Sequence, residues 1–203
     1  KYFENNTENA KKLFDICVAN NLKNFIFSST AAAYGNPINE APITEDNILK
    51  PLNPYGESKI QTENYLQNEL ECNYIILRYF NVAGADPKMR SGLISKKATH
   101  LIKIASEVAV GKRQEITIYG DDYPTPDGTA IRDYIHVSDL ADVHVKAAEY
   151  LIKYNKSNII NCGYGKGFSV KDVLDVVNKV NNNPISINIG ERRVGDSSSL
   201  VSN

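Results

Sequence analysis

The segment Tyr55-Gly56-Glu57-Ser58-Lys59 places a phenol and an ammonium group four residues apart. Residues at positions i and i+4 of a helix share a face, so we expect Lys59 to lie near Tyr55. A nearby cation favours the phenolate and lowers the pKa of a tyrosine from its usual value of about 10. Tyr55 is therefore a candidate general acid/base. An exposed helix with a solvated lysine has the same spacing, so the spacing alone leaves both interpretations open.

Three hydroxyl side chains, Ser28, Ser29 and Thr30, directly follow the apolar run Phe25–Phe27. That run predicts a short buried strand. Open α/β sheets bind ligands in the crevice outside the carboxyl ends of their strands. We therefore expect a hydroxyl from Ser29 or Thr30 to meet the phenol of Tyr55 there. Ordinary turn chemistry is the alternative explanation for these hydroxyls.

The elements that must position these groups alternate along the first half of the chain. An apolar stripe predicts a helix over Thr7–Asn21 with Thr7 as its N-cap. After a loop over 34–54, Pro54 suits the first turn of a helix over Tyr55–Leu70, and Tyr74–Leu77 predicts a second buried strand. This order predicts an α/β fold with a doubly wound parallel sheet.

The second half is less regular but continues the alternation. Strands are predicted over Ile116–Tyr119 and Asn158–Asn161. Three helices are predicted, over Ala98–Val110 with Gly111 as its C-cap, from Ser138 as N-cap to about Ile152, and after the capping box Ser169-x-x-Asp172.

Composition excludes several classes of function. Lys plus Arg number 23 against 24 Asp plus Glu, which gives no basic footprint for nucleic acid or anionic lipid. No apolar run approaches the roughly 18 residues of a membrane span, so we expect a soluble, cytoplasmic protein. The three cysteines and three histidines are scattered, so no metal site is expected. The chain starts at Lys1 within a helical pattern and ends in a polar stretch, which suggests a fragment.

Long strings of residues resemble the extended short-chain dehydrogenase/reductase family and, within it, the UDP-glucose 4-epimerases. The similarity extends from Tyr2 to the end of the chain. The strings are Ser28-Ser29-Thr30-Ala31-Ala32-Ala33-Tyr34-Gly35, Tyr55-x-x-x-Lys59, Arg78-Tyr79-Phe80-Asn81, the run from Ile118 to Thr129, and Ile131-Arg132-Asp133-Tyr134-Ile135-His136-Val137.

The resemblance implies a role for each matching residue. Thr30, Tyr55 and Lys59 would be the catalytic set and would also contact NAD, together with Asn5 and Phe80. UDP-glucose or UDP-galactose would be bound by a larger set: Thr30, Tyr55, Asn81, Thr117, Ile118, Tyr119, Arg132, Arg193, Asp196 and Leu200. A planar guanidinium suits a diphosphate, which agrees with the two arginines in this set.

The resemblance also implies a mechanism and an organisation. Tyr55 would take the proton of the C4 hydroxyl, NAD would take the C4 hydride, and the 4-keto sugar would turn over and receive the hydride on its other face. Residues 1–87 would be the C-terminal part of the NAD-binding domain and 88–203 a smaller substrate-binding region. About 132–162 would return to the nucleotide-binding sheet. A homodimer would form through paired helices, one of them Thr7–Asn21 or Tyr55–Leu70.

Some features depart from the family pattern. The glycine-rich loop G-x-x-G-x-x-G, which lays the pyrophosphate on a helix N-terminus, is absent, so the Rossmann-like fold is truncated at its N-terminus and we expect this chain alone not to hold NAD. The run Gly163–Gly167 lacks the spacing of a cofactor loop. Thr99-His100-Leu101 differs from the Asn-Asn-Leu of some members, which puts a substrate contact by His100 in doubt. Leu200 stands where some epimerases carry Tyr, which would make room for UDP-N-acetyl sugars.

Two other functions remain as alternatives. A nucleotide-sugar 4,6-dehydratase shares the fold, the tyrosine and the lysine, but needs acidic residues directly after the catalytic threonine. Ala31 and Ala32 stand there instead. The second alternative, for the chain as given, is a catalytically inactive fragment that binds a nucleotide-sugar.

Overall fold

The computed structural model describes residues 1–37, 42–95 and 98–203, so part of the predicted loop over 34–54 lies outside the described residues. Three parallel strands form the first sheet, in the order β1-β2-β6. They are β1 (Asn24–Thr30), β2 (Asn73–Tyr79) and β6 (Asn158–Cys162). The register aligns Ser29 with Arg78 and Arg78 with Asn161, so three polar residues form one row across the sheet.

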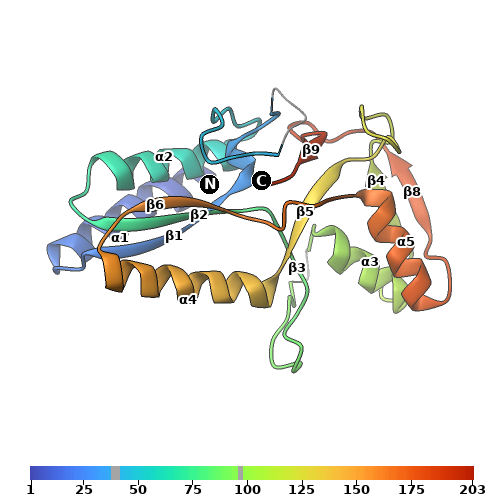
Figure 1. Cartoon of the computed structure of the whole chain (residues 1–203). Coiled ribbons are helices and arrows are strands. Elements are labelled where there is room, and N and C mark those ends of the chain that lie inside the picture. The colour runs from blue at the N-terminus through green and yellow to red at the C-terminus, as the bar shows by residue number, and fades with distance from the viewer. Residues whose placement is uncertain (38–41, 96–97) are drawn as a thin grey trace.

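Helices cover both faces of this sheet (Figure 1). Ile75 and Leu77 of β2 pack with α4 (Val137–Tyr154), whereas Ile76 packs between α1 (Asn9–Ala19) and α2 (Pro54–Asn68). Strands buried on both faces are continuous apolar runs, which is why the β2 sequence is apolar without alternation. The predicted parallel α/β architecture is confirmed.

The other part of the molecule holds shorter sheets. Strand β5 (Ile131–His136) pairs with β3 (Asn81–Ala83), β7 (Gly167–Ser169) and β9 (Ser199–Leu200). Strand β4 (Ile116–Tyr119) pairs with β8 (Ile187–Gly190). Helices α3 (Leu101–Ala109) and α5 (Val170–Asn181) pack over β4 around Ala105, Ile118 and Leu174.

Local hydrogen bonds decide several element boundaries. The predicted N-cap at Thr7 is wrong: a π-helix, η1 (Phe3–Glu8), precedes α1, and buried Thr7 instead donates from Oγ1 to the carbonyl of Ser58 at 3.0 Å. The N-cap predicted at Ser138 is also wrong, because His136 holds that place and its Nδ1 accepts from the backbone N–H of Ser138 at 3.2 Å. The capping box at Ser169 is confirmed.

Two helix ends follow ordinary capping rules. Pro54 is the first residue of α2, and the side chain of Asn53 accepts from the backbone N–H of Gly56 at 2.9 Å. Helix α3 begins at Leu101, three residues later than predicted, and Gly111 follows it with a φ of 73°. A left-handed residue of this kind is the usual end of a helix.

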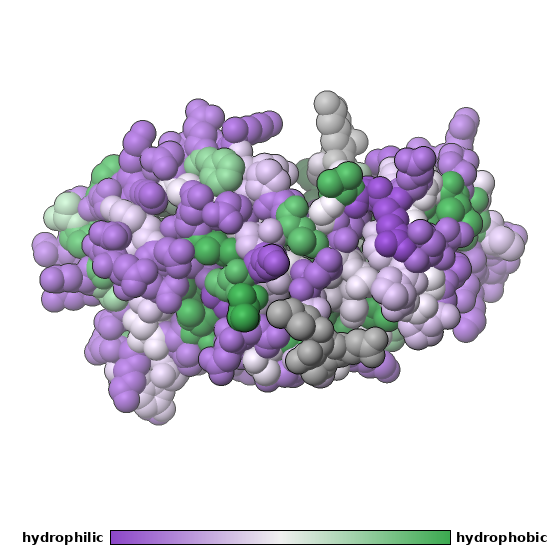
Figure 2. Space-filling model, turned by 90° about the horizontal axis from the view of Figure 1, so that it is seen from above, coloured by the Kyte–Doolittle hydropathy of each residue, from purple (hydrophilic) through white to green (hydrophobic). Residues whose placement is uncertain are grey.

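The surface seen from above is largely hydrophilic, with hydrophobic side chains in small separate groups (Figure 2). Within the described ranges, no helix has the length and apolar character needed to cross a membrane. Among the same residues, no group of three or more His, Cys, Asp or Glu side chains could hold a metal ion.

Asp133 on β5 organises the run Gly163–Gly167. Its fully buried carboxylate accepts from the backbone N–H groups of Tyr164 and Gly165, each at 2.9 Å, and of Ser202 at 3.3 Å. Two amides of this glycine-rich turn are thus bound to an internal anion, as expected of a structural turn and not of a phosphate loop.

Replacing Asp133 with Ala is expected to lower the free energy of unfolding by about 3 kcal/mol, because it leaves the buried amide of Ser202 and the part-buried amides of Tyr164 and Gly165 without their acceptor. Urea unfolding followed by circular dichroism measures the change. Asp142→Ala, at an exposed position on α4, is the matched control and should change stability by less than about 0.5 kcal/mol. Equal midpoints for the two variants would contradict the prediction.

Candidate active site

Thr30 and Tyr55 meet at the carboxyl edge of the first sheet. Thr30 is the last residue of β1, and its Oγ1 accepts from the backbone N–H of Ala32 at 3.1 Å, which starts the short helix η2 (Ala31–Ala33). Tyr55 stands in the first turn of α2, where the hydroxyl of Thr30 is close enough to its phenol to lower the pKa of that phenol. The sequence-based expectation that a hydroxyl of β1 and the phenol of Tyr55 lie together at this edge agrees with this placement.

The lowered pKa that the sequence predicts for Tyr55 is wrong. Burial raises the pKa of the phenol, the hydrogen bond with Thr30 lowers it, and the neighbouring Tyr79 and Tyr2 raise it again. The net direction is upward, whereas the sequence predicts a lowered value. Burial is the largest cause of the upward direction, and Lys59 does not offset it: its Nζ donates to the carbonyl of Ser28 at 2.9 Å and lies 6.0 Å from the centroid of the Tyr55 ring.

The ammonium group of Lys59, which is a residue of α2, points toward the first sheet. Its Nζ is 4.9 Å from the centroid of the Phe27 ring on β1. Burial lowers the pKa of Lys59, and the charge of Glu63, one helical turn further along α2, raises it in part. The ammonium is therefore held beside the candidate acid/base rather than solvated, which decides against the exposed-helix interpretation of the Tyr-x-x-x-Lys spacing.

Two cavities open beside these residues. The first, of about 220 Å³, is lined by Thr30, Phe80, Asn81, Arg132, Arg193, Asp196 and Leu200, among others. The second, of about 700 Å³, is lined by Tyr55, Asn81, Thr117, Ile118, Tyr119, Arg132, Arg193 and Asp196, among others. The shared residues Asn53, Asn81, Arg132, Arg193 and Asp196 make the two cavities neighbours.

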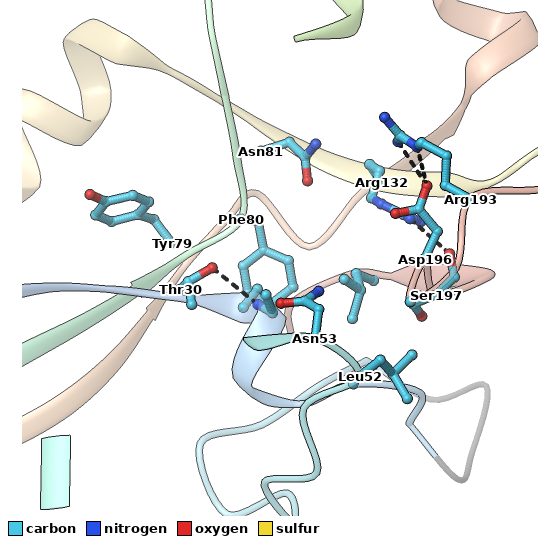
Figure 3. A pocket seen from close by; sticks show the side chains of 15 residues that line it. Thr30, Leu52, Asn53, Tyr79, Phe80, Asn81, Arg132, Arg193, Asp196 and Ser197 are labelled. Atoms are coloured by element: carbon cyan, nitrogen blue, oxygen red, sulfur yellow. Dashed lines mark hydrogen bonds and ion pairs between the residues drawn. The ribbon is translucent and has the colours of Figure 1, made fainter. Parts of the chain in front are cut away.

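Most of the residues predicted from the sequence therefore line one of two neighbouring cavities. Figure 3 shows Thr30 and Tyr79 on one side of the first cavity and Arg132, Arg193 and Asp196 on the other. Asn5 and Lys59 do not line either cavity; Asn5 is exposed on η1. His100, whose role the sequence puts in doubt, does line the second cavity.

The two arginines of the first cavity differ in their partners. Arg193 is paired with Asp196, with Nη2 2.7 Å from Oδ2. Arg132 donates only to backbone carbonyls, from Nη1 to Ile131 at 2.8 Å and from Nη2 to Ser197 at 2.7 Å, and among the described residues it has no carboxylate within ion-pair distance. Burial lowers the pKa of Arg132. The charge of Asp196 acts on Arg132 and raises this pKa in part. A half-buried cation without a carboxylate at ion-pair distance among the described residues makes this wall of the cavities attractive to an anion.

Sequence reasoning missed three buried polar neighbours of this site. Glu63 of α2 and Arg78 of β2 form a buried ion pair with Nη2 and Oε2 2.6 Å apart, and Tyr34 accepts from Nη1 of Arg78 at 3.1 Å. A signal was present, since Arg78 is a charge that directly follows the predicted buried strand Tyr74–Leu77. Charged residues are almost never fully buried unless they are paired.

The parallel sheet, with polar side chains and cavities at the carboxyl ends of its strands, is the arrangement in which open α/β proteins bind their ligands. Comparison with known proteins is more specific. Residues 1–163 match the NAD dependent epimerase/dehydratase family. The chain belongs to this family.

Individual relatives agree with that assignment. The chain is 47% identical to a UDP-glucose 4-epimerase of Azospirillum brasilense over 98% of its own length, and 46% identical to one of Halalkalibacterium halodurans over 99%. It spans 58% and 61% of the lengths of these two relatives. Three fifths of a relative's chain is thus represented here.

Solved structures show the same likeness in three dimensions. The UDP-glucose 4-epimerase of Brucella ovis in complex with NAD superimposes with a TM-score of 0.92 at 38% identity, covering 100% of this chain and 63% of its own. The enzyme of Bifidobacterium longum in complex with NAD+ and UDP gives 0.91 at 37% identity, covering 99% and 61%. The predicted Rossmann-like fold, represented in part, is confirmed.

Proposed function

We propose that this chain is the catalytic and substrate-binding part of a UDP-glucose 4-epimerase, which interconverts UDP-galactose and UDP-glucose. The observation that carries the proposal is the proximity of Thr30 and Tyr55 beside cavities lined by Arg132, which has no carboxylate at ion-pair distance among the described residues. The names of the relatives support it, as does the likeness to structures that contain NAD and UDP. Catalysis would be an isomerisation with no net oxidation.

The cofactor of this proposal is NAD, and the residues present fit one end of it. Thr30, Tyr55 and Phe80 lie at the carboxyl edge of the sheet, and Lys59 donates to the same edge. Hydroxyl, phenol and ammonium donors suit the nicotinamide and its ribose. Asn5 is the fifth residue that the resemblance implies as a contact of NAD. When bound, NAD supplies a reversible hydride acceptor. The sequence contains no G-x-x-G-x-x-G motif for the pyrophosphate, so we propose that this chain alone is inactive.

The chain's own residues would divide the remaining work. Tyr55 in its phenolate form takes the proton of the C4 hydroxyl and returns it at the end, which is general base and then general acid catalysis. Thr30 hydrogen-bonds at the same place, and Lys59 supplies positive charge. Arg132 and Arg193 hold the diphosphate, while Asn81, Thr117, Ile118, Tyr119, Asp196 and Leu200 complete the substrate contacts.

The dehydratase alternative finds no support beside Thr30. Elimination of water needs an acid/base pair in addition to Tyr55, and the two residues after Thr30 are Ala31 and Ala32. Ala31 is buried in η2 and Ala32 donates its backbone N–H to Thr30. Of the two carboxylates that line the cavities, Asp196 is bound to Arg193, and Glu115 lines the second cavity, which Thr30 does not line. We therefore favour epimerisation.

Proton NMR of the full-length protein with UDP-galactose and no added reductant tests the proposal. Decay of the galactose anomeric signal to a fixed mixture with UDP-glucose is the expected result. The matched control is the 203-residue chain alone, which should give no conversion. A 4-keto-6-deoxy signal, or no change with NAD bound, would overturn the epimerase proposal.

Arg132→Met is expected to weaken the binding of UDP by about 10- to 100-fold, the effect of losing hydrogen bonds to a charged group. Isothermal titration with UDP measures the change. Arg90→Met is the control, because Arg90 is exposed and paired with Asp86 away from both cavities. If the two variants bind UDP equally well, Arg132 does not hold the diphosphate.

Leu200 bears on the substrate range. It lines the first cavity from β9, directly beside Arg132 in the β5–β9 register. We expect the full-length protein to convert UDP-N-acetylgalactosamine as well as UDP-galactose, and Leu200→Tyr to reduce the first activity by about 10-fold or more, since a pocket excludes a group it has no room for. Rates with both substrates measure this. No turnover of the acetylated substrate by the unchanged protein would contradict the prediction.

We further propose that the protein is cytoplasmic and forms a homodimer. We also propose that each chain is divided into the domains 1–87 and 88–203. Leu13 and Ile16 of α1 are 57% and 60% exposed, which supports a helix-mediated contact. The pairing of β6 with β2 and the packing of α4 on the same sheet support the return of the chain to that sheet within 132–162. Light scattering after size-exclusion chromatography measures the oligomeric state.

A further inference from the structure

A buried ion pair lies one helical turn beyond Lys59. The carboxylate of Glu63 accepts from Nε of Arg78 at 3.1 and 3.2 Å and from Nη2 at 2.6 Å. The two side chains are 0% and 4% exposed. The cost of removing two charges from water offsets much of their attraction, so a buried pair is weak evidence for stability. This pair is better explained by what it holds in place.

On one side, the pair fixes α2 to the residues that precede Thr30. Ser29 is fully buried, and its Oγ donates to Oε1 of Glu63. Lys59 donates to the carbonyl of Ser28 at 2.9 Å. Two successive turns of α2 thus bind two successive residues of β1. Tyr55 stands one turn earlier on the same helix face, where it meets Thr30.

On the other side, the pair fixes the residues that follow Thr30. Nη1 of Arg78 donates to the hydroxyl of Tyr34 at 3.1 Å, and this hydroxyl donates to Oδ1 of Asn161 at 2.7 Å. Tyr34 is 1% exposed and directly follows η2. The chain is therefore held immediately before Thr30, at Ser29, and shortly after it, at Tyr34. Arg78 reaches Ser29 through Glu63, and it binds Tyr34 directly.

We propose that Glu63 and Arg78 are positioning residues, which hold Thr30 on β1 in register with Tyr55 and Lys59 on α2. The positioning role rests on the proposed function insofar as Tyr55 is the acid/base of that reaction. The geometry favours it over a purely stabilising role because each hydrogen bond of the pair ends on Ser29, on Tyr34 or on the partner itself, apart from one to the carbonyl of Glu45 at 3.3 Å.

The charges around Tyr55 and Lys59 come from several elements. Glu63 lies on α2, Arg78 and Tyr79 on β2, and Tyr2 stands before η1. From α4, His144 reaches Ser28 with Nε2 3.3 Å from Oγ. Neither Glu63 nor Arg78 is among the groups that shift the pKa of Tyr55, and replacing both keeps the net charge near it the same, although Lys59 loses the charge that raises its own pKa. A change in its titration would then report a change in geometry.

The test is the double variant Glu63→Leu/Arg78→Met in the full-length protein. Apolar residues of similar volume commonly replace a buried ion pair at little or no cost in stability. We expect the variant to fold, its kcat for UDP-galactose to fall by about 10- to 100-fold, and its KM to change by less than about threefold, because a misplacement on the order of 1 Å costs about that much in rate. Arg78→Lys keeps the positive charge but loses the planar guanidinium, and its kcat is expected to lie between those of the unchanged protein and the double variant.

A readout without turnover keeps the positioning role separate from the reaction. Carbon-13 NMR of ζ-labelled tyrosine, with Tyr55 assigned from Tyr55→Phe, gives the pKa of that phenol. Thr30→Val removes the hydrogen bond that lowers this pKa, and we expect the double variant to raise it in the same direction. Asp86→Asn/Arg90→Gln, which removes an exposed pair, is the control and should leave both readouts unchanged.

The outcomes separate cleanly. If the folded double variant keeps kcat within twofold and the titration of Tyr55 does not move, the pair is purely structural and the inference is wrong. If the double variant does not fold, Arg78→Lys decides by the same two readouts. If the unchanged protein converts no UDP-galactose, the proposed function fails, and the Tyr55 titration alone decides the positioning role.

Discussion

Replacing Tyr55 with Phe is expected to lower kcat for UDP-galactose by about 10²- to 10⁴-fold, the usual contribution of a general acid/base. The change removes one oxygen atom and keeps the ring that packs 5.8 Å from Tyr2, centroid to centroid, so the fold should be unaffected. Because burial raises the pKa of Tyr55, the rate of the unchanged protein is expected to rise with pH above neutrality as the phenolate forms. The residual rate of the variant should lose this dependence.

The control for this prediction is Tyr65→Phe. Tyr65 stands on the same helix, and its hydroxyl donates to Asp15 on α1 at 2.5 Å, away from both cavities. The same chemical change there should leave kcat within about twofold. Proton NMR of UDP-galactose conversion at several pH values measures both variants. A Tyr55→Phe variant with a rate close to that of Tyr65→Phe would show that another group carries the proton.

The sequence predicted the placement of Thr30 and Tyr55 because short-range rules decide it. An apolar run followed by hydroxyls marks the end of a buried strand, and Pro54 marks the first turn of the next helix. Both elements then meet at the carboxyl edge of one sheet. The direction of Lys59 was not predictable in this way. The i, i+4 rule says that Lys59 shares a face with Tyr55, but which acceptor the ammonium reaches depends on the position of β1.

The far wall of the site depends on contacts between residues distant in sequence. Arg132 reaches the carbonyl of Ser197, and Leu200 enters the cavity because β9 pairs with β5. No periodicity in the sequence encodes that pairing, so these residues were identified through the family resemblance alone. The same holds for the N-cap of α4, where a histidine, an unusual N-cap residue, displaced the expected serine.

Glu63→Gln is expected to lower the free energy of unfolding by about 3 to 5 kcal/mol, because it leaves the guanidinium of Arg78 buried without its counter-charge. Arg78→Met should cost a similar amount, since it leaves the Glu63 carboxylate with Ser29 as its one remaining hydrogen-bond partner among the described residues. Each loss corresponds to a fall in the melting temperature of about 6 to 20 °C for a protein of this size.

The decisive comparison is with the double variant Glu63→Leu/Arg78→Met, which buries no unpaired charge. Its stability is expected to lie close to that of the unchanged protein, so the two single effects should be strongly non-additive. Urea unfolding of all four proteins measures the coupling, with Asp86→Asn as a surface control whose midpoint should not move. Additive losses in the double variant would mean that Glu63 and Arg78 act on separate partners. Strong coupling without loss of stability would leave the pair's effect on kcat to be explained by the position of Thr30 against α2.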